Sequence, residues 1–295
     1  MASKVYFTKT ITPAKVIEMF KILKKDLPGK VAVKIHSGEK GNFNFIKPEF
    51  WKPVRDYVKG TFVECNTAYP GERNSTEKHK KLLKEHGWDD AGGVDLLDEE
   101  GPDITLKIPN GILIKENYIG KKTKNYDSTL VLIHFKGHIM GGYGGALKQL
   151  SIGYGSTRGK AYQHSAGRSD DQNKCWGKGV MATDKEFKES MADAASSIVH
   201  FFKGNLAYVA VLANISIDCD CCDKPEKPAI SDIGILSSTD PVALDQAAYD
   251  LICKSNEPGK EKWLKRVEDR MGLHIIESAT KLGIGKKEYE LVNVD

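Results

Sequence analysis

The chain has 295 residues and a formal net charge of +4, from 44 Lys and Arg residues against 40 Asp and Glu residues. Its 40% hydrophobic and 28% charged composition is that of a globular protein and excludes a disordered or fibrous chain. So small a positive charge, spread over this length, does not favour a nucleic-acid partner. The longest mostly apolar stretches, residues 129–135 and 206–217, are far shorter than the roughly 20 residues that span a bilayer. Because the N-terminus also lacks the apolar segment of a secretory signal, we expect a cytoplasmic protein without a membrane partner.

Short apolar runs alternate with helical segments along the chain. Residues 4–8 are predicted to form a strand, and Thr12-Pro13 supplies an N-cap and a first-turn proline for the helix that follows. Residues 30–36 are predicted to form a buried strand that ends in a polar, glycine-bearing loop at residues 37–42. Further strands are predicted at residues 61–65, 112–114, 129–135, 206–212 and 233–236. This alternation predicts an α/β fold, with a layered mixed or mostly parallel sheet and helices on both faces.

Two helix starts are predicted in the second half of the chain. One helix begins near Thr183-Asp184, and another begins at Asp240-Pro241, where an N-cap again precedes a first-turn proline. Residues 289–292 are predicted to add an edge strand. The sequence shows no internal repeat and no shift in composition. Residues 1–295 are therefore predicted to form a single α/β domain, with a polar loop at residues 165–183.

A glycine-rich segment directly follows the predicted strand at residues 129–135. It reads Phe135-Lys-Gly-His-Ile-Met-Gly-Gly-Tyr-Gly-Gly-Ala-Leu-Lys148, so that His138 and Lys148 bracket four glycines. Glycine permits positive φ angles and a close backbone approach, and such a loop could present N–H groups, including those of Gly144 and Gly145, to an anionic or flat ligand. The segment matches neither a P-loop nor a dinucleotide-binding fingerprint. The alternative is a mobile surface loop.

Thiols form a second candidate site. Three of the six cysteines lie in the segment Ile217-Asp-Cys-Asp-Cys-Cys-Asp-Lys-Pro225, namely Cys219, Cys221 and Cys222. Thiolates suit zinc, cuprous copper or iron–sulfur centres, and Cys175 could supply a fourth ligand, although the paired Cys-x-x-Cys spacing of a structural zinc site is lacking. The alternative is an exposed loop solvated by its carboxylates. Cys65 and Cys253, which stand alone, are expected to be inert buried thiols.

Other polar side chains are candidates for substrate and metal binding. Lys34, His36 and Arg73 could bind a substrate carboxylate or phosphate, because guanidinium and ammonium groups suit such anions. Glu72 could act as a base if burial raised its pKa, and a structural salt bridge is the alternative. His164 is a candidate metal ligand, with a structural role as the alternative. The remaining histidines are expected to be structural or at the surface: His79, His86, His134, His200 and His274.

The whole chain resembles the family known as domain of unknown function 362. The resemblance is carried by Lys34-Ile-His-Ser-Gly-Glu39, Tyr69-Pro-Gly-Glu-Arg73, Gly137-His-Ile-Met-Gly-Gly-Tyr-Gly-Gly-Ala-Leu-Lys148 and Asp232-Ile-Gly-Ile-Leu-Ser-Ser-Thr-Asp-Pro241. Many members of this family bear a ferredoxin-type iron–sulfur insert after the position of His164. This chain keeps a single cysteine there, Cys175, so we do not expect an insert-borne four-iron cluster.

A more distant resemblance is to the catalytic domain of the nickel-pincer lactate racemases, which has a similar histidine, glycine-rich stretch and lysine, followed by another histidine. In those enzymes the lysine tethers the pincer cofactor, the later histidine binds nickel and the first histidine shuttles a proton. The resemblance therefore implies these roles for Lys148, His164 and His138, respectively. The second proton-shuttling histidine falls at Glu72 in this chain, so a symmetric two-histidine racemisation is not implied.

These observations predict a metal- or cofactor-binding protein and favour an enzyme that acts on a small anionic substrate, such as a carboxylate, by proton or hydride transfer. It would be a metal-dependent isomerase or oxidoreductase, with nickel, iron, zinc or a metal-bearing organic group as its cofactor. The alternative is a thiol-based metal-binding or iron–sulfur electron-transfer protein that works with a redox partner and has no catalysis of its own. A non-catalytic sensor of a small anion is a third possibility.

Overall fold

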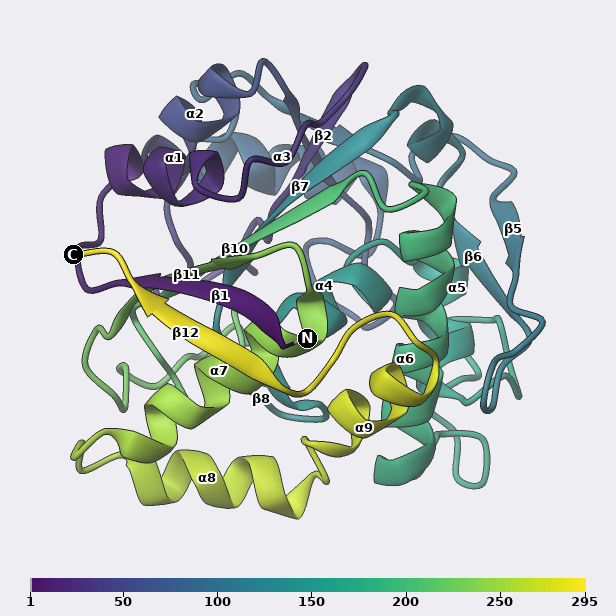
Figure 1. Ribbon diagram of the computed structural model, residues 1–295. Helices are drawn as coiled ribbons and strands as arrows, with labels where there is room; N and C mark the ends of the chain where they lie inside the picture. Colours follow the sequence, from purple (N-terminus) through teal and green to yellow (C-terminus); the bar gives the residue numbers. More distant parts are fainter. Residues whose placement is uncertain (1) are drawn as a thin grey trace.

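A computed structural model describes residues 2–295 and places an eight-stranded sheet at their centre, in the order β12-β1-β11-β10-β7-β2-β3-β4 (Figure 1). The strands are β1 (Ser3–Thr8), β2 (Val31–Lys34), β3 (Thr61–Glu64), β4 (Val94–Leu96), β7 (Ser128–His134), β10 (Leu206–Leu212), β11 (Gly234–Ser238) and β12 (Tyr289–Asn293). Neighbours from β4 to β10 are parallel, whereas β11 runs antiparallel to both β10 and β1. The prediction of a mixed, mostly parallel sheet is confirmed, and β12 is the expected edge strand.

Helices cover both faces of this sheet (Figure 1). On one face lie α1 (Pro13–Lys21), α2 (Pro48–Tyr57) and α3 (Thr76–Glu85), and on the other lie α4 (Ala146–Ser151), α6 (Asp184–Phe201) and α7 (Pro241–Lys254), with α9 (His274–Lys281) packed against α6. Alternate residues of the central strands enter the two cores. In β7, for example, Leu130 and Leu132 face α1 and α2, and Val131 and Ile133 face α4. Strands buried on both faces are expected to be continuously apolar, as β10 is throughout and β7 is from Leu130 to Ile133.

The predicted helix starts are confirmed because each is set by local hydrogen bonds. The Thr12 hydroxyl accepts the Lys15 N–H at the start of α1, and Asp240 accepts the N–H groups of Val242 and Ala243 at the start of α7. Thr183 caps α6 with a reciprocal capping box. The remaining helices are α5 (Thr157–His164), α8 (Lys260–Asp269) and the short 3-10 helix η1 (Lys121–Asn125). Among residues 2–295, no helix has the length and apolar character needed to cross a membrane.

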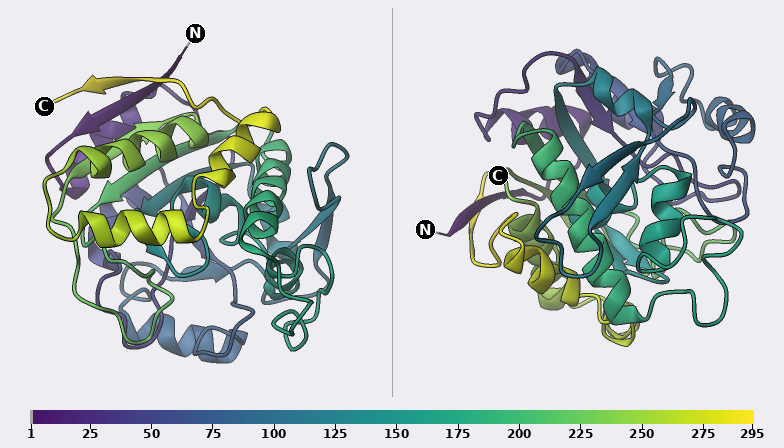
Figure 2. Two further views of the ribbon diagram at one scale, coloured as in Figure 1. Left: turned by 90° about the horizontal axis from the view of Figure 1, so that it is seen from below. Right: turned by 90° about the vertical axis from the view of Figure 1, so that its right-hand side faces the viewer.

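The prediction of a strand at residues 112–114 is wrong. These residues form a bend between β5 (Ile104–Lys107) and β6 (Glu116–Ile119), which pair as a separate hairpin at one side of the molecule (Figure 2). The N–H groups of Ile112, Leu113 and Ile114 all donate to the Asp193 carboxylate, at 2.6 to 2.8 Å. The donors that a strand would use for its ladder are therefore engaged by a side chain of α6.

The glycine-rich segment is not the loop that its composition predicts. It forms the hairpin β8 (Lys136–His138) and β9 (Gly142–Gly144) and then enters α4, which carries Lys148. A Cβ atom at Gly137 would lie 1.9 Å from the Ile217 carbonyl oxygen, and Gly142 has a φ of 80°. These two glycines are therefore required for close packing of the hairpin and for its turn.

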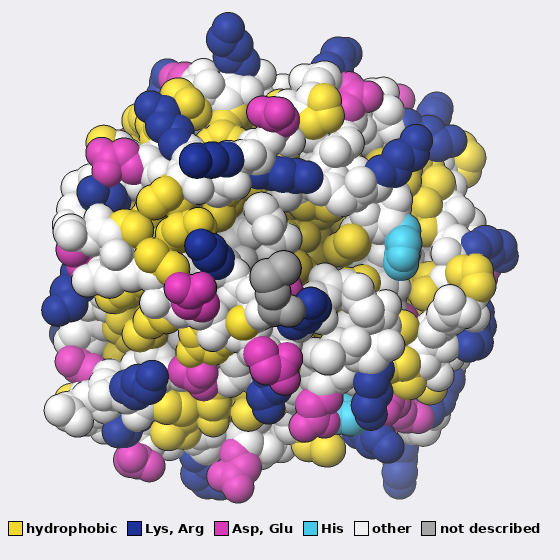
Figure 3. All heavy atoms as spheres, in the orientation of Figure 1, with side chains coloured by type: hydrophobic (Ala, Val, Ile, Leu, Met, Phe, Trp, Pro, Cys, Tyr) yellow, Lys and Arg dark blue, Asp and Glu magenta, His cyan; other side chains and the backbone are white. Residues whose placement is uncertain are grey.

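On the face shown in Figure 3, Lys and Arg side chains are interspersed with Asp and Glu side chains, in keeping with the small net charge.

Candidate functional site

A cavity of about 280 Å³ lies beyond the carboxyl ends of the parallel strands β2, β3 and β7. Ligands of α/β sheets commonly bind at this edge, because the loops that follow parallel strands meet there. The cavity is lined by His36, Glu64, Cys65, Thr67, Tyr69, Arg73, His138, Ile139, Met140, Lys148, Gln149, Ile152, Gly153, Lys160, His164, Trp176, Asp218, Cys219, Cys221 and Cys222.

Most of the residues singled out from the sequence meet in this cavity. They are His36, Arg73, His138, Lys148, His164, Cys219, Cys221 and Cys222. Five others do not line it: Lys34, Glu72, Gly144, Gly145 and Cys175. The structure thus unites the histidines, the lysine and the clustered thiols, whereas the individual roles assigned to these residues stay predictions.

Two of the charged residues outside the cavity have protein partners. Lys34 is fully buried and forms an ion pair of 2.7 Å with Glu64. Burial lowers the pKa of Lys34, and the Glu64 carboxylate opposes that effect. Glu72 lies near the surface, with its carboxylate 3.8 Å from the Lys78 ammonium. A base at Glu72 would therefore act from outside the cavity lining.

The three small residues outside the cavity have packing contacts. Cys175 is buried beside Ala68, and burial raises the pKa of its thiol to about 11. Gly144 belongs to β9, and a Cβ atom at Gly145 would lie 2.3 Å from an Asp245 carboxylate oxygen. The polar loop that contains Cys175 connects α5 with α6.

Lys148 differs from the paired charged residues of the cavity in its surroundings. Its side chain is almost fully buried, and among residues 2–295 its ammonium has no ion-pair or hydrogen-bond partner. Burial, together with the charges of Lys136 and Arg73, lowers the pKa of Lys148 from its ordinary 10.5 to about 7. The helix that carries it is held by Asp245, whose carboxylate accepts the N–H groups of Ala146 and Leu147 at 2.6 and 3.0 Å.

His138 presents one ring nitrogen to the cavity in a defined protonation state. Its Nδ1 accepts the backbone N–H groups of Met140 and Gly141, at 3.1 and 2.7 Å. Burial and the nearby charge of Lys148 hold the pKa of His138 well below its usual range, so the ring is neutral. A neutral imidazole whose Nδ1 accepts hydrogen bonds carries its proton on Nε2. The Nε2–H of His138, which has no partner among the described residues, is therefore available as a hydrogen-bond donor.

His164 reaches the cavity from the end of α5. Its ring stacks on Phe187, with 4.7 Å between ring centroids, and also contacts Trp176. Burial and the charge of Lys148 lower the pKa of His164 to about 3, so this ring is neutral too. Its Nδ1 is buried and has no hydrogen-bond partner among the described residues. An orphaned buried nitrogen of this kind is suited to a bound group, since leaving it unpaired carries a desolvation cost.

Arg73 is held rigidly at the cavity wall. Its Nε lies 3.2 Å from a carboxylate oxygen of Glu39, and its Nη2 donates to the Tyr69 hydroxyl at 2.5 Å. The charge of Arg73 is thus balanced by Glu39, and part of its guanidinium fork is already engaged.

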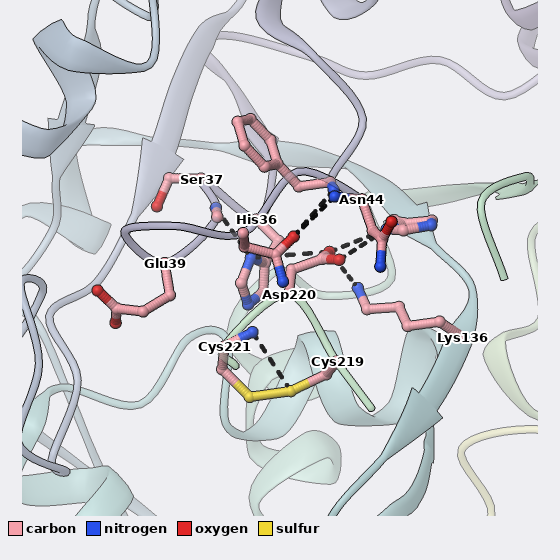
Figure 4. A network of polar contacts seen from close by, with 12 residues as sticks. His36, Ser37, Glu39, Asn44, Lys136, Cys219, Asp220 and Cys221 are labelled. Carbon is pink, nitrogen blue, oxygen red and sulfur yellow. Dashed lines mark hydrogen bonds and ion pairs between the residues drawn. A yellow bond between two sulfur atoms is a disulfide. The ribbon is translucent and has the colours of Figure 1, made fainter. Parts of the chain in front are cut away.

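Asp220 anchors the loop that carries the thiols. Its buried carboxylate lies 2.7 Å from the Lys136 ammonium and 2.9 Å from Nδ1 of His134. Although burial alone would raise it, these partners hold the pKa of Asp220 well below its usual range. Figure 4 shows the Asp220 carboxylate directed toward Lys136 and the sulfur atoms of Cys219 and Cys221 lying apart from it. Asp220 therefore anchors the loop on the side away from the two sulfur atoms, while Asp218 lines the cavity together with the cysteines.

The two cysteines that flank Asp220 are joined by a disulfide, and Cys222 is a free thiol (Figure 4). One donor atom each from His138, Cys219 and Cys221 lies within 4.8 Å of the other two. Reduction of the disulfide would thus place two thiols and an imidazole within reach of one metal ion. The metal or metal-bearing cofactor expected from the sequence stays a prediction, and this group is a candidate site for it.

Sequence reasoning missed several residues that shape the site. Glu64 and Lys160 line the cavity, while His134 and Lys136 hold the thiol loop through Asp220. The sequence carried no clear signal for Asp220, because it lies in a turn closed by the hydrogen bond from the Cys222 N–H to the Cys219 carbonyl. His134 was expected to be structural, and its contacts with Asp220 and with the Ala213 carbonyl are of that kind.

Comparison with known proteins places these observations in a family. Two solved structures are similar at low identity: the lactate racemase apoprotein from Thermoanaerobacterium thermosaccharolyticum, at 11% identity and a TM-score of 0.48, and a protein from Thermotoga maritima, at 14% and 0.44. The matches cover 84% and 92% of this chain but only 56% and 59% of those chains, so this chain spans little more than half of their length. No curated protein matches it. The model of the family described as Domain of unknown function (DUF362) matches residues 31–250, a range that contains every residue lining the cavity. The chain therefore belongs to the DUF362 family.

Proposed function

We propose that this protein is an enzyme that binds a small carboxylate in the cavity and transfers a proton to or from it with Lys148 and His138. One observation carries the proposal. Lys148, a buried lysine with no ion-pair or hydrogen-bond partner among residues 2–295, shares a cavity with a neutral histidine whose Nε2–H has no partner in that range either.

The charges of the cavity favour an anionic ligand. Its carboxylates have cationic partners: Glu64 is paired with Lys34, and Asp218 is paired with Arg266. Lys148 has no such partner, and an isolated buried charge is costly. A carboxylate in the cavity would offset that cost while Lys148 is an ammonium, and the pKa of about 7 leaves the amine form of Lys148 populated near neutral pH to act as the base.

Lys148 and His138 can together move a proton at a carbon next to a carboxylate or carbonyl. A base serves best when its pKa lies near the working pH, as that of Lys148 does. In the proposed step the carbon–hydrogen bond breaks, its proton goes to the Lys148 amine, and its electron pair moves to the adjacent oxygen. The Nε2–H of His138 donates to that oxygen as negative charge develops there. The reverse step returns the proton to carbon.

The proposal is tested by exchange of the C2 hydrogen of short 2-hydroxy carboxylates and of the C3 hydrogens of short 2-oxo carboxylates in heavy water, followed by proton NMR. The wild type is expected to catalyse exchange with at least one of these acids, and Lys148→Met to lower the rate by at least about a hundredfold. Lys78→Met, which removes an exposed ammonium, is the matched control and should retain exchange. Absence of both exchange and saturable carboxylate binding in the wild type, or equal exchange in Lys148→Met, would contradict the proposal.

A second candidate function is metal binding by thiols without catalysis. It is favoured by the proximity of His138, Cys219 and Cys221, whose donors suit zinc, iron or nickel once the thiols are reduced. Metal analysis of anaerobically purified protein separates the two functions. The metal-binding function is favoured over the enzyme if Cys221→Ser loses the bound metal while Lys148→Met keeps it, and if neither wild type nor Lys148→Met binds a carboxylate.

A further inference from the structure

We propose that Cys219 and Cys221 form a redox switch for a metal site: as a dithiol they bind a thiophilic divalent ion together with His138, and as a disulfide they release it. The proposal rests on the second candidate function and adds the regulation of that site. It requires that the same two sulfur atoms bind the metal ion in the reduced protein and bind each other in the oxidised protein.

The same donor atoms take part in both states. The structure holds the disulfide form, and both sulfur atoms already lie within 4.8 Å of a His138 ring nitrogen. Metal ions bind thiolate sulfur, and a disulfide has neither the charge nor the free valence of a thiolate. Formation of the sulfur–sulfur bond therefore removes two of the three donors at once.

The loop is held in place by contacts that do not depend on the disulfide. Asp220 is anchored by Lys136 and His134, and its carbonyl accepts the Glu39 N–H at 2.8 Å. The Asn42 side chain donates to the Cys222 carbonyl at 3.0 Å. Reduction would therefore leave the two thiols near His138, with little loss of order on metal binding.

Metal binding would also change the hydrogen bonds of His138. Its Nδ1 accepts N–H groups from Met140 and Gly141 in the disulfide form. An ion at Nδ1 would use the lone pair that accepts them, and an ion at Nε2 would leave the proton of the neutral ring on Nδ1. Either way these two hydrogen bonds are lost, so metal loading must change the turn between β8 and β9.

The redox step is an ordinary thiol–disulfide exchange with a low-molecular-weight disulfide as oxidant. Cys221 is more exposed than Cys219, so its thiolate is the one that attacks first. That attack forms a mixed disulfide and releases one small thiolate. Cys219 then attacks the sulfur of Cys221, closes the intramolecular disulfide and releases the second thiolate. The two protons of the cysteine thiols end on the two released thiols.

The test is a titration of the full-length protein with Co²⁺, whose thiolate charge-transfer absorbance reports sulfur ligation. Reduced protein is expected to bind one ion per chain, with an affinity at least about a hundredfold higher than that of protein oxidised with glutathione disulfide. Peptide mass spectrometry of the oxidised protein should find Cys219 joined to Cys221. In the reduced protein, Co²⁺ should accelerate hydrogen exchange of the Met140 and Gly141 amides.

Variants make each outcome decisive. Cys219→Ser and Cys221→Ser should lose tight binding, whereas Cys253→Ser, which removes a thiol outside the cavity, should keep both states. Thermal unfolding confirms that each variant is folded. Failure of reduced wild type to bind Co²⁺ overturns both the metal-binding function and the switch. Equal affinity for Co²⁺ in the two redox states overturns the switch alone. Loss of the redox dependence in Cys222→Ser also overturns it, because Cys222 would then be a member of the disulfide.

Discussion

Replacement of Lys148 by methionine is expected to stabilise the fold while it abolishes carboxylate binding. Methionine fills a similar volume, and no ion pair is broken because the Lys148 ammonium has no partner among the described residues. The substitution therefore removes a buried charge without leaving a counter-charge behind. Most substitutions in a packed interior destabilise, so a gain in stability is a demanding prediction.

The size and the pH dependence of the effect follow from the lowered pKa of Lys148. A pKa that falls from 10.5 to about 7 on folding means that the unfolded chain holds the proton more tightly than the folded one. The stability linked to this group is fully present above 10.5 and is lost as the pH falls toward 7. At pH 7 the loss is roughly 4 kcal/mol, and near pH 9 it is about half as large.

Urea unfolding of wild type and Lys148→Met at these two pH values measures the difference directly. The variant should be more stable at pH 7, and its advantage should shrink as the pH is raised. Lys78→Met, at an exposed position, should change the free energy of unfolding by no more than about 0.5 kcal/mol. A variant that is less stable than wild type at pH 7, or an advantage that does not depend on pH, would show that Lys148 is not a buried and uncompensated cation.

Three further substitutions test the surroundings of the cavity. Glu64→Gln should destabilise the protein by about 3–5 kcal/mol in urea unfolding, because it leaves the buried Lys34 ammonium without its partner. Gly137→Ala should cost about 1–3 kcal/mol and weaken carboxylate binding measured by calorimetry, because its Cβ would meet the Ile217 carbonyl at 1.9 Å. Burial raises the pKa of Asp245 from 3.8 to about 7, so the stability linked to it is present at low pH and is lost as the pH rises toward 7. As the pH rises from about 4 to about 7, the free energy of unfolding of Asp245→Asn should therefore increase by a few kcal/mol relative to that of wild type.

Each of these substitutions has its own control. Replacing Lys34 and Glu64 together by Met and Leu should recover most of the stability that Glu64→Gln loses, since no buried charge then remains. Gly101→Ala places its Cβ where no atom lies within 4 Å and should be nearly neutral. For Asp245→Asn, a stability difference from wild type that stays constant over that pH range would show that the carboxyl group does not titrate there.

Local patterns account for the parts of the fold that were predicted correctly. The starts of α1, α6 and α7 depend on a cap and a proline or acidic residue within one turn, so a few neighbouring residues suffice to determine them. The central strands are apolar because both of their faces are covered, and that burial leaves a continuous run in the sequence.

The errors arose where a distant residue decides the local structure. Residues 112–114 have the β-branched composition of a strand, but their N–H groups bind Asp193, which lies about 80 positions further along the chain. Gly137 also depends on a distant residue, because it lies against the backbone of Ile217, while the predicted approach of Gly144 and Gly145 to a ligand stays a prediction. Composition alone does not distinguish a glycine that makes room for a ligand from one that makes room for the chain itself.

The candidate site likewise depends partly on local sequence and partly on contacts between distant segments. Residue types and spacing were enough to single out His138, Lys148, His164 and the three clustered thiols, since imidazole, amine and thiol groups near glycine-rich turns are chemically conspicuous. Their convergence on one cavity depends on the order of the parallel strands, which brings loops that are distant in sequence to the same edge of the sheet. The charge state of Lys148 depends on burial and on neighbours from other segments, because desolvation and Coulomb forces act through space and not along the chain.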